Sequence, residues 1–434
     1  MGYCPRRSGK IRGKITKCVD TDVSSWPNTP TNLRGVSVAP NLATVRRPAP
    51  AQQTVSAPQK KVVPRSSGRV TAKSLREDIE RSWHLCREAI ATGNKAAIRA
   101  LHQVAKEQDG LTNYENLRAD LVRYRSYFPS CAHIEPELIE PELIPVRSRS
   151  LEERLFKIVR GYWSMPYSKG YGRRLRFIVM DRHHEAVMGI IGLQSPSADL
   201  ACRDDYLGVP KADKLKVVNN TLDAYTIGAT PTYAPLLAGK LVAGLLHAPL
   251  VQQEYWRIYG NKRTTQLKQR VPQPLLAITT ASAFGRSSIY NKLRNEDRLL
   301  AKPLGFTKGF GTFHLEEHYP RITRWLEQRG RCVPAGFGNG PKVRWQNIMR
   351  ALVDLKISRD FLEHGLRREV FIFELITNLQ DVCQNHKLPQ PAPFDAEQWA
   401  AFWKSRWCLP RVERNPEWYE ADSLGVLRQA LGVA

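Results

Sequence analysis

Two apolar segments joined by a short polar turn constrain the fold of this chain more than any other part of the sequence. Residues 175–180 and 186–193 are rich in Val, Ile and Leu and flank five polar residues, a spacing that predicts a β-hairpin. A third strand-like segment, 224–228, precedes an apolar helix that begins near Leu236, and a fourth, 275–280, precedes a serine-rich segment. Strands interrupted by helices in this way predict an α+β core.

The rest of the chain divides into segments of different composition around this core. Residues 1–73 contain 14 Lys or Arg against two Asp and show no hydrophobic periodicity, so we predict a disordered basic arm. Helical spacing predicts a helical module with an acidic linker over 74–146 and a C-terminal helical domain over 319–434. The α+β core is then expected over 147–318.

Proline positions and apolar spacing give three local predictions. The tandem Ile-Glu-Pro-Glu-Leu repeat at 134–143 is expected to be an extended linker, because its prolines exclude a helix. The apolar residues of 359–386 predict a helix. The tryptophan-rich segment 399–419 is expected to pack a helical subdomain against a partner surface. A scaffold whose tryptophan-rich tail docks a larger helicase is a third possible function, and truncation after Pro389 should then abolish complex formation only.

The charge of the chain indicates the class of its ligand. Lys and Arg number 66 against 41 Asp and Glu, which gives a net charge of +25. Such a field favours polyanions, with DNA or RNA ahead of an anionic membrane surface. The sequence has neither an apolar run of membrane-spanning length nor a secretory leader, so we expect a cytoplasmic protein. The eight cysteines include no Cys-x-x-Cys, and neither a disulfide framework nor a zinc site is predicted.

A cluster of charged and amide residues follows the hairpin. Arg203, Asp204 and Asp205 are adjacent, and Asn219 and Asn220 come about fifteen residues later. Paired carboxylates can hold a divalent metal or act as a base, while amides can orient a phosphate or a nucleobase. A salt-bridged turn with Asx caps explains the same residues. Both interpretations are open at this point.

A second candidate site follows the strand-like segment 275–280. Arg286, Ser287 and Tyr290 are expected at the start of a helix, where exposed N–H groups, hydroxyls and a guanidinium would bind phosphate. An ordinary serine N-cap is the alternative. Tyr290 as a nucleophile on DNA would need a neighbouring metal or base.

Aromatic and cationic residues also meet at the entrance to the core. The glycine-rich segment 162–172 carries several aromatic residues and leads to Arg173 and Arg174. Its rings could stack on bases or plug one edge of the sheet. A basic groove beside the sheet is expected near Arg203, Arg286 and Lys308.

Two histidine motifs have the composition of metal sites but the wrong context. The segment 314–318 matches His-x-x-Glu-His, which needs both histidines on one helix, yet a strand is predicted there. Asp181, His183, His184 and Glu185 lie where the hairpin must turn, so a solvated turn is predicted. No metal ligands are assigned.

One family resembles this sequence in several blocks. The segment GIIGLQSPSADLACRDDYLG (189–208), followed by VVNN (217–220), is similar to the signature block of the DruA proteins of Druantia anti-phage systems. Three further segments occur in the order that this family shows: 256–260, 284–290 and 304–309. The resemblance spans about 150–315 and implies a cytoplasmic antiviral defence role beside a large helicase-like partner. It implies no known catalytic mechanism.

A second resemblance is to the GNAT-type acyltransferase fold. In that family a strand ends near a proline and enters a helix whose N-terminus binds the pyrophosphate of acetyl-CoA. In this chain 225–231 leads into 236–240, and 277–290 and 304–306 follow in the same order. The family's loop is Gln/Arg-x-x-Gly-x-Gly/Ala, whereas 234–238 is apolar and contains a proline. The resemblance therefore implies a GNAT-like mixed sheet without an acetyl-CoA loop.

The leading hypothesis is a nucleic-acid-binding component of a bacterial anti-phage defence system that acts with a larger helicase-like partner. DNA or RNA and other defence subunits are the expected partners. The alternative is an enzyme, with either a degenerate acyltransferase-like core or a metal-dependent DNA-processing activity that uses Asp204 and Asp205. A divalent metal is the one cofactor that this alternative would need.

Overall fold

The described residues all belong to one compact unit, Ser67–Ala434, of the computed structural model. The structure describes residues 70–108, 113–165, 172–264, 268, 275–334 and 343–432. Most of the predicted basic arm lies outside the described residues, and so does part of the aromatic segment 162–172. In the described part of the chain, none of the helices carries an apolar stretch long enough to cross a bilayer.

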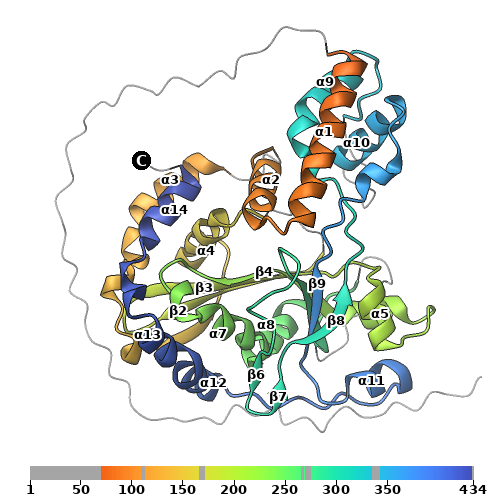
Figure 1. Ribbon diagram of the computed structural model, residues 1–434. Coiled ribbons are helices and arrows are strands. Elements are labelled where there is room, and N and C mark those ends of the chain that lie inside the picture. Colours follow the sequence, from red (N-terminus) through yellow and green to blue (C-terminus); the bar gives the residue numbers. More distant parts are fainter. Residues whose placement is uncertain are drawn as a thin grey trace, which may run out of the picture. The chain divides into compact units, whose positions relative to one another are not determined.

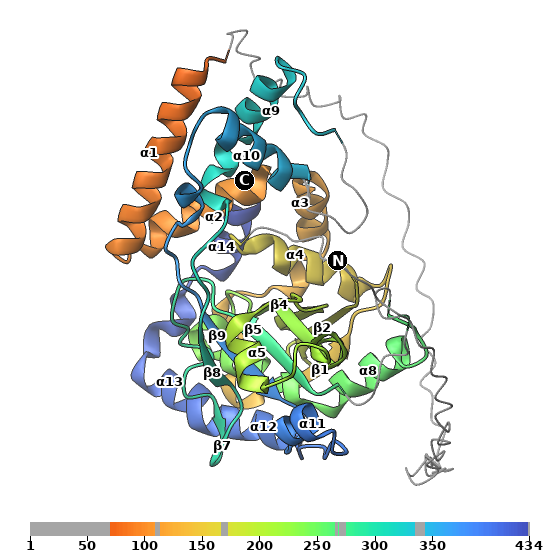
Figure 2. The same ribbon diagram turned by 90° about the vertical axis from the view of Figure 1, so that its right-hand side faces the viewer.

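A seven-stranded mixed sheet organises this unit (Figures 1 and 2). Its strand order is β1-β2-β3-β4-β5-β9-β8. The strands are β1 (Pro141–Pro145), β2 (Arg174–Asp181), β3 (Ala186–Gln194), β4 (Thr221–Ala229), β5 (Ala277–Ala281), β8 (Lys302–Phe306) and β9 (Glu369–Glu374). The predicted α+β class is confirmed, and β2 and β3 form the expected hairpin. The GNAT-like part of the fold prediction stays a prediction.

The pairing of β4 with β5 is parallel, whereas the other neighbours in this sheet are antiparallel. It spans the three pairs Thr221↔Ala277, Leu222↔Ile278 and Asp223↔Thr279. Beyond Asp223 and Thr279 the two strands no longer pair, so this point at the centre of the sheet is where polar side chains of both strands meet.

One face of the sheet is covered by α7 (Ala238–Gly244), α8 (Pro249–Tyr259) and α12 (Ala396–Trp403), which lie below it in Figure 1. Trp399 is fully buried there, and its indole Nε1 donates a 2.9 Å hydrogen bond to the Leu241 carbonyl. Its ring occupies the space that a Cβ at Gly244 would need. The prediction that the tryptophan-rich segment packs on a partner surface is therefore wrong for Trp399, because the face of α7 next to it is apolar and needs cover.

The other face carries two separate apolar clusters. The first surrounds Ile178 and Ile190 and is formed by α3 (Tyr114–Arg123), α4 (Leu151–Tyr162) and α14 (Ser423–Leu431). The second surrounds Ile372 and is formed by α5 (Ala201–Leu207), α6 (Lys214–Asn219) and α11 (Leu379–Asn385). Asp223 and Thr279 share this face of the sheet, because Thr279 pairs with Ile372.

The first helix of the described chain and the helices between residues 319 and 354 form a further apolar cluster (Figure 1). Leu75 and Ile79 of α1 pack with Trp325 and Ile348. The helices of this region are α1 (Ala72–Ala91), α2 (Lys95–Gln108), α9 (Tyr319–Glu327) and α10 (Val343–Asp354). The domain boundaries predicted at 146/147 and 318/319 stay a prediction.

Three local predictions are wrong for identifiable reasons. The repeat 134–143 contains a 3-10 turn, and β1, which begins at Pro141, is an edge strand, where proline is tolerated. The predicted helix 359–386 is divided into β9 and α11, because 370–373 is a short apolar run of strand-forming residues. The segment 313–318 is a 3-10 helix rather than a strand.

Candidate nucleic-acid interface

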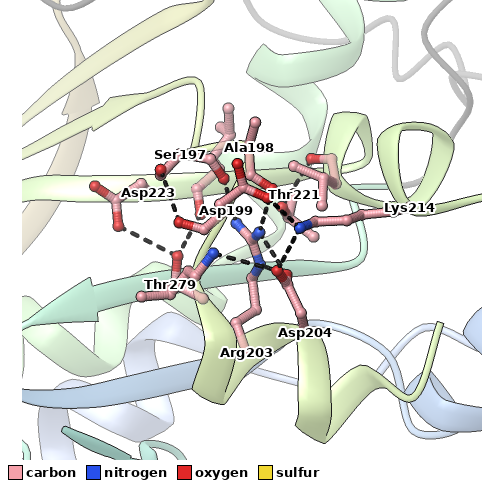
Figure 3. A network of polar contacts seen from close by, with 12 residues as sticks. Ser197, Ala198, Asp199, Arg203, Asp204, Lys214, Thr221, Asp223 and Thr279 are labelled. Atoms are coloured by element: carbon pink, nitrogen blue, oxygen red, sulfur yellow. Dashed lines mark hydrogen bonds and ion pairs between the residues drawn. The ribbon is translucent and has the colours of Figure 1, made fainter. Parts of the chain in front are cut away.

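Arg203 of α5 lies at the centre of a polar network beside the sheet (Figure 3). Its side chain has no exposed surface. The guanidinium donates to the carbonyls of Ser197 at 2.7 Å and Ala198 at 3.2 Å, and through Nε and Nη2 to Asp204 Oδ1 at 2.9 and 2.6 Å. A phosphate could reach Arg203 only by displacing these contacts, so its predicted nucleic-acid role stays a prediction.

The two predicted catalytic carboxylates have different surroundings. Asp204 Oδ2 accepts hydrogen bonds from Lys214 Nζ at 2.9 Å and from the Leu200 N–H at 3.2 Å. Burial raises the pKa of Asp204, but the hydrogen bonds from Lys214 and Arg203 outweigh it and hold the pKa below its usual range. Asp205 is exposed. The structure thus surrounds Asp204 with cations of its own chain and leaves Asp205 in solvent.

A carboxylate outside the predicted site lies at the centre of the sheet. Thr279 Oγ1 donates a 3.2 Å hydrogen bond to Asp223 Oδ1 across the β4–β5 pair (Figure 3). Burial raises the pKa of Asp223 to about 6, although hydrogen bonds from Thr279 and Gln194 and the charge of Arg203 oppose the shift. Such a carboxyl can exchange a proton near neutral pH. The sequence signal that was missed is Asp223 itself, an ionisable residue directly before the predicted strand segment 224–228.

Arg173 and Asn219 are brought together, but through the backbone of Asn219. The Arg173 guanidinium donates to the Asn219 carbonyl and to the Tyr255 hydroxyl, and at 3.3 Å to the Thr221 carbonyl. Only 8% of Arg173 is exposed. The side-chain oxygen of Asn220 is buried without a hydrogen-bond partner among the described residues. These contacts fix the end of α6 to α8 and the start of β4.

The residues after β5 do not form the predicted helix. Turns occupy this segment instead, and Arg286 is exposed while Ser287 is half-buried. Tyr290 is 6% exposed and packs against Phe371 and Phe373. The helix prediction was wrong because Ser287 caps a short turn, in which its hydroxyl accepts from the Ile289 N–H. The assigned roles of these residues stay predictions.

Asp181 and His184, which close the β2–β3 hairpin, are occupied by local hydrogen bonds. His184 Nδ1 lies 2.6 Å from Asp181 Oδ2, and His184 Nε2 accepts the Glu135 N–H at 3.0 Å. Glu135, His183 and His184 present ligand atoms within 4.8 Å of one another. Because Nε2 of His184 already accepts a hydrogen bond, this ring has no lone pair left for a metal ion.

The segment that leads into α7 does not fit a pyrophosphate. Tyr233, Leu236 and Ala238 are buried, and Pro235 has no N–H to donate. Lys240 Nζ is held by the carbonyls of Ser288, Ile289 and Asn291 at 2.9 to 3.3 Å. Residues 233–240 therefore do not offer the exposed backbone N–H groups that the pyrophosphate of acetyl-CoA or ATP needs.

Two adjoining cavities instead form a basic groove between α3, α4, α8 and the end of the sheet formed by β1 and β2. Their volumes are about 240 and 340 Å³, and both are lined by Lys157 and Arg176. The cations of this groove, hereafter the basic groove, are Arg147, Arg154, Lys157, Arg160, Arg174 and Arg176. Three carboxylates also line the groove, those of Asp120, Glu153 and Glu254. Of the residues predicted to bind nucleic acid, Arg174 lines the basic groove.

The cations of the basic groove are positioned by regular elements. Arg154, Lys157 and Arg160 occur three residues apart on α4, a spacing that places side chains on one helix face. Arg154 and Lys157 are half exposed, and their nearest carboxylates, Asp120 and Glu153, lie 3.3 Å away. This spacing was the sequence signal for the groove, and the prediction missed it because it used only the apolar face of the same helix.

Lys308, the remaining predicted contact, is exposed just after β8. It does not line either cavity of the basic groove. The residues predicted to form one interface therefore occupy several places in the structure.

Comparison with known proteins identifies the family. A family model described as Druantia protein DruA matches residues 92–385. The Druantia protein DruA of Escherichia coli (strain UMEA 4076-1) is 33% identical over 335 residues, which cover 76% of this chain and 83% of that protein. No solved structure matches the chain. The match exceeds half of the chain and agrees with the order of blocks seen in the sequence, and the chain therefore belongs to the DruA family of Druantia proteins.

Proposed function

We propose that this protein is a nucleic-acid-binding component of a Druantia anti-phage defence system and that its basic groove binds the sugar–phosphate backbone. The basic groove is the observation that carries the proposal. It gathers six cations, of which Arg160 is buried, and three carboxylates in a concave surface, on a chain whose net charge is +25. A concave basic surface focuses the field on a polyanion.

Two cations of the basic groove, Arg154 and Lys157, can exchange their carboxylate partners for phosphates. The Arg154 and Lys157 side chains are 51% and 47% exposed, while the Asp120 and Glu153 side chains that they pair with are each 15% exposed. Ion pairs with an exposed partner of this kind stabilise a protein by on the order of 1 kcal/mol. A phosphate can replace Asp120 or Glu153 as their partner at little cost. Guanidinium groups also bind phosphate through two parallel hydrogen bonds.

The proposal includes a helicase-like partner and other defence subunits, as the resemblance to Druantia systems implies. Gly239-Lys240-Leu241 is not a nucleotide-binding loop, and Lys240 is held by backbone carbonyls. ATP hydrolysis would then be supplied by the partner. The helicase partnership is tested separately by copurification. The partner should copurify with this protein, and nuclease treatment shows whether polynucleotide is needed to hold the two together.

A salt titration tests nucleic-acid binding. Fluorescence anisotropy of a labelled polynucleotide with the full chain should give an affinity that falls steeply between about 50 and 200 mM salt, because binding releases counterions. An affinity that does not change over this range would contradict the proposal. Polyglutamate of similar length serves as a control for binding to any polyanion.

A second candidate function is enzymatic, and the structure favours Asp223 over Asp204 and Asp205 for its acid–base group. Asp223 is the carboxyl whose pKa of about 6 suits proton transfer, whereas Asp204 is held ionised by Lys214 and Arg203. If the protein processes DNA, Asp223→Asn should abolish product formation in Mg²⁺ or Mn²⁺ without loss of DNA affinity. Asp205→Asn is the matched control. Full activity of Asp223→Asn would exclude this role.

A further inference from the structure

Two exposed phenylalanines end the edge strand of the sheet. β8 pairs with β9 on one side and has no neighbour in this sheet on the other, and it lies at the side of the sheet in Figure 1. Phe306 is its last residue and is 39% exposed, and Phe310, four residues later, is 53% exposed. Both rings therefore keep much of their apolar surface in water, where a ligand can reach them.

The backbone that carries these rings is fixed. The Thr307 N–H donates to the Arg368 carbonyl at 2.9 Å, and the Gly309 carbonyl accepts from the Gly365 N–H at 3.0 Å. Gly309 has a φ of +73°, and a Cβ there would lie 2.9 Å from the Gly365 backbone. The close approach of these two backbone segments requires glycine at position 309. The rings are thus presented by a rigid segment rather than by a loose loop.

Two cations accompany this segment, one over a ring and one between the two phenylalanines in the sequence. Lys308 lies between them and is exposed, and the Arg367 guanidinium lies over the Phe306 ring at 5.5 Å from its centroid. Phe310 contacts Trp345 of α10, with ring centroids 6.1 Å apart. Within the described part of the chain, neither Lys308 nor Arg367 forms an ion pair. Exposed aromatic rings with unpaired cations beside them are the elements of a stacking surface for single-stranded nucleic acid.

We infer that Phe306 and Phe310, with Lys308 and Arg367, form a stacking site for the unpaired bases of a single-stranded polynucleotide. The inference rests on the proposed nucleic-acid-binding function and adds to it the strandedness of the ligand. A duplex keeps its bases stacked on one another, so only an unpaired strand can place bases on both rings. Four residues of extended chain span at most about 14 Å, which limits the ligand to a few nucleotides per site.

Acidic neighbours favour stacking as the main contribution at this site. Glu369 pairs with Phe306 across β8 and β9, and Glu363 bridges to Phe310. These two carboxylates offset part of the positive charge of Lys308 and Arg367. Removal of the rings should weaken single-strand binding with little change in its salt dependence, whereas removal of cations from the basic groove should change the salt dependence.

The test is the affinity of the full chain for a fluorescently labelled oligo(dT) and for a labelled duplex of the same length. Phe306→Ala and Phe310→Ala should each weaken binding to oligo(dT) by roughly fivefold or more, the minimum expected for one lost base–ring stack. Duplex affinity should stay within about twofold. Tyr419→Ala removes an aromatic ring that is 48% exposed on another part of the surface and should leave both affinities unchanged.

Phe306→Leu and Phe310→Leu keep an apolar side chain and should lose most of the same affinity, which separates stacking from simple apolar contact. Thermal unfolding of each variant confirms that the fold is retained.

Unchanged binding to oligo(dT), or an equal loss for oligo(dT) and duplex, would overturn the inference. If these variants bind normally while Lys157→Gln binds weakly, this inference alone fails. If the wild-type protein binds neither ligand at low salt, the proposed function itself fails.

Discussion

Arg203 and Asp204, adjacent in the sequence, form an ion pair with 2.6 Å between Nη2 and Oδ1, in which the Arg203 side chain is fully buried. Lys214 adds a second cation, 2.9 Å from the other carboxylate oxygen. A buried arginine of this kind depends on its carboxylate partner, because an isolated charge in the interior is strongly destabilising. The pair holds the segment before α5 against that helix, since Arg203 also donates to the carbonyls of Ser197 and Ala198.

Replacement of Asp204 should therefore destabilise the fold. Asp204→Ala leaves the Arg203 guanidinium buried without its carboxylate, and we expect a loss of about 3 kcal/mol in the free energy of unfolding. Urea unfolding followed by circular dichroism measures it. The exposed neighbour provides the control, and Asp205→Ala should change stability by less than about 0.5 kcal/mol. Equal stability of the two variants would show that the buried pair has no structural role.

The raised pKa of Asp223 predicts a pH-dependent stability. The folded protein takes up a proton on Asp223 more readily than the unfolded chain, so this group makes the protein less stable as pH rises from its ordinary pKa of 3.8 to about 6. The difference in unfolding free energy between wild type and Asp223→Asn isolates this contribution from the other carboxyls. It should change by on the order of 1 to 3 kcal/mol between pH 4 and pH 7. A flat difference would exclude the raised pKa.

The cations of the basic groove should set the salt dependence of duplex binding. Arg154→Gln and Lys157→Gln each remove one phosphate contact, and each should reduce the slope of log affinity against log salt by about 0.9. Arg414→Gln, an exposed change on α13 (Leu409–Arg414), is the control and should leave the slope unchanged. Unaltered slopes for both groove variants would place the DNA elsewhere.

The buried tryptophans predict that the C-terminal segment stabilises the fold itself. Trp399→Ala removes a fully buried ring and its hydrogen bond to the Leu241 carbonyl, and should cost about 4 kcal/mol of unfolding free energy. Trp256→Ala, at a side chain that is 52% exposed, is the matched control, with an expected change of about 0.5 kcal/mol. Truncation after Pro389 would then unfold the protein rather than release a partner only. A truncated chain with unchanged thermal stability would contradict this.

The sequence was sufficient to predict the hairpin of β2 and β3 and the α+β class, because period and turn chemistry act locally. The sequence was insufficient where contacts with distant segments decide whether a stretch forms a helix or a strand. Residues 370–373 form a short apolar run that fits a helix or a buried strand equally well, and only its place between β5 and β8 makes it a strand. Pro141 excluded a helix but did not show that its segment pairs with β2.

The candidate site was predicted less completely for the same reason. Adjacent residues such as Asp204 and Asp205 look equivalent in sequence, but on a helix they project in different directions, and one is enclosed by cations while the other is exposed. The cations of the basic groove come from α4, β2 and the segment before α4. Their convergence depends on how α4 packs on the sheet, which spacing within one segment does not reveal.

The central claim is that the folded unit, rather than the basic N-terminal arm alone, binds a polynucleotide. The most direct test is the affinity of the protein without its first 69 residues for labelled single- and double-stranded DNA and RNA. The account predicts binding at about 50 mM salt that weakens steeply by about 200 mM. If the shortened protein remains folded but binds none of these ligands even at the lower salt concentration, the account is contradicted.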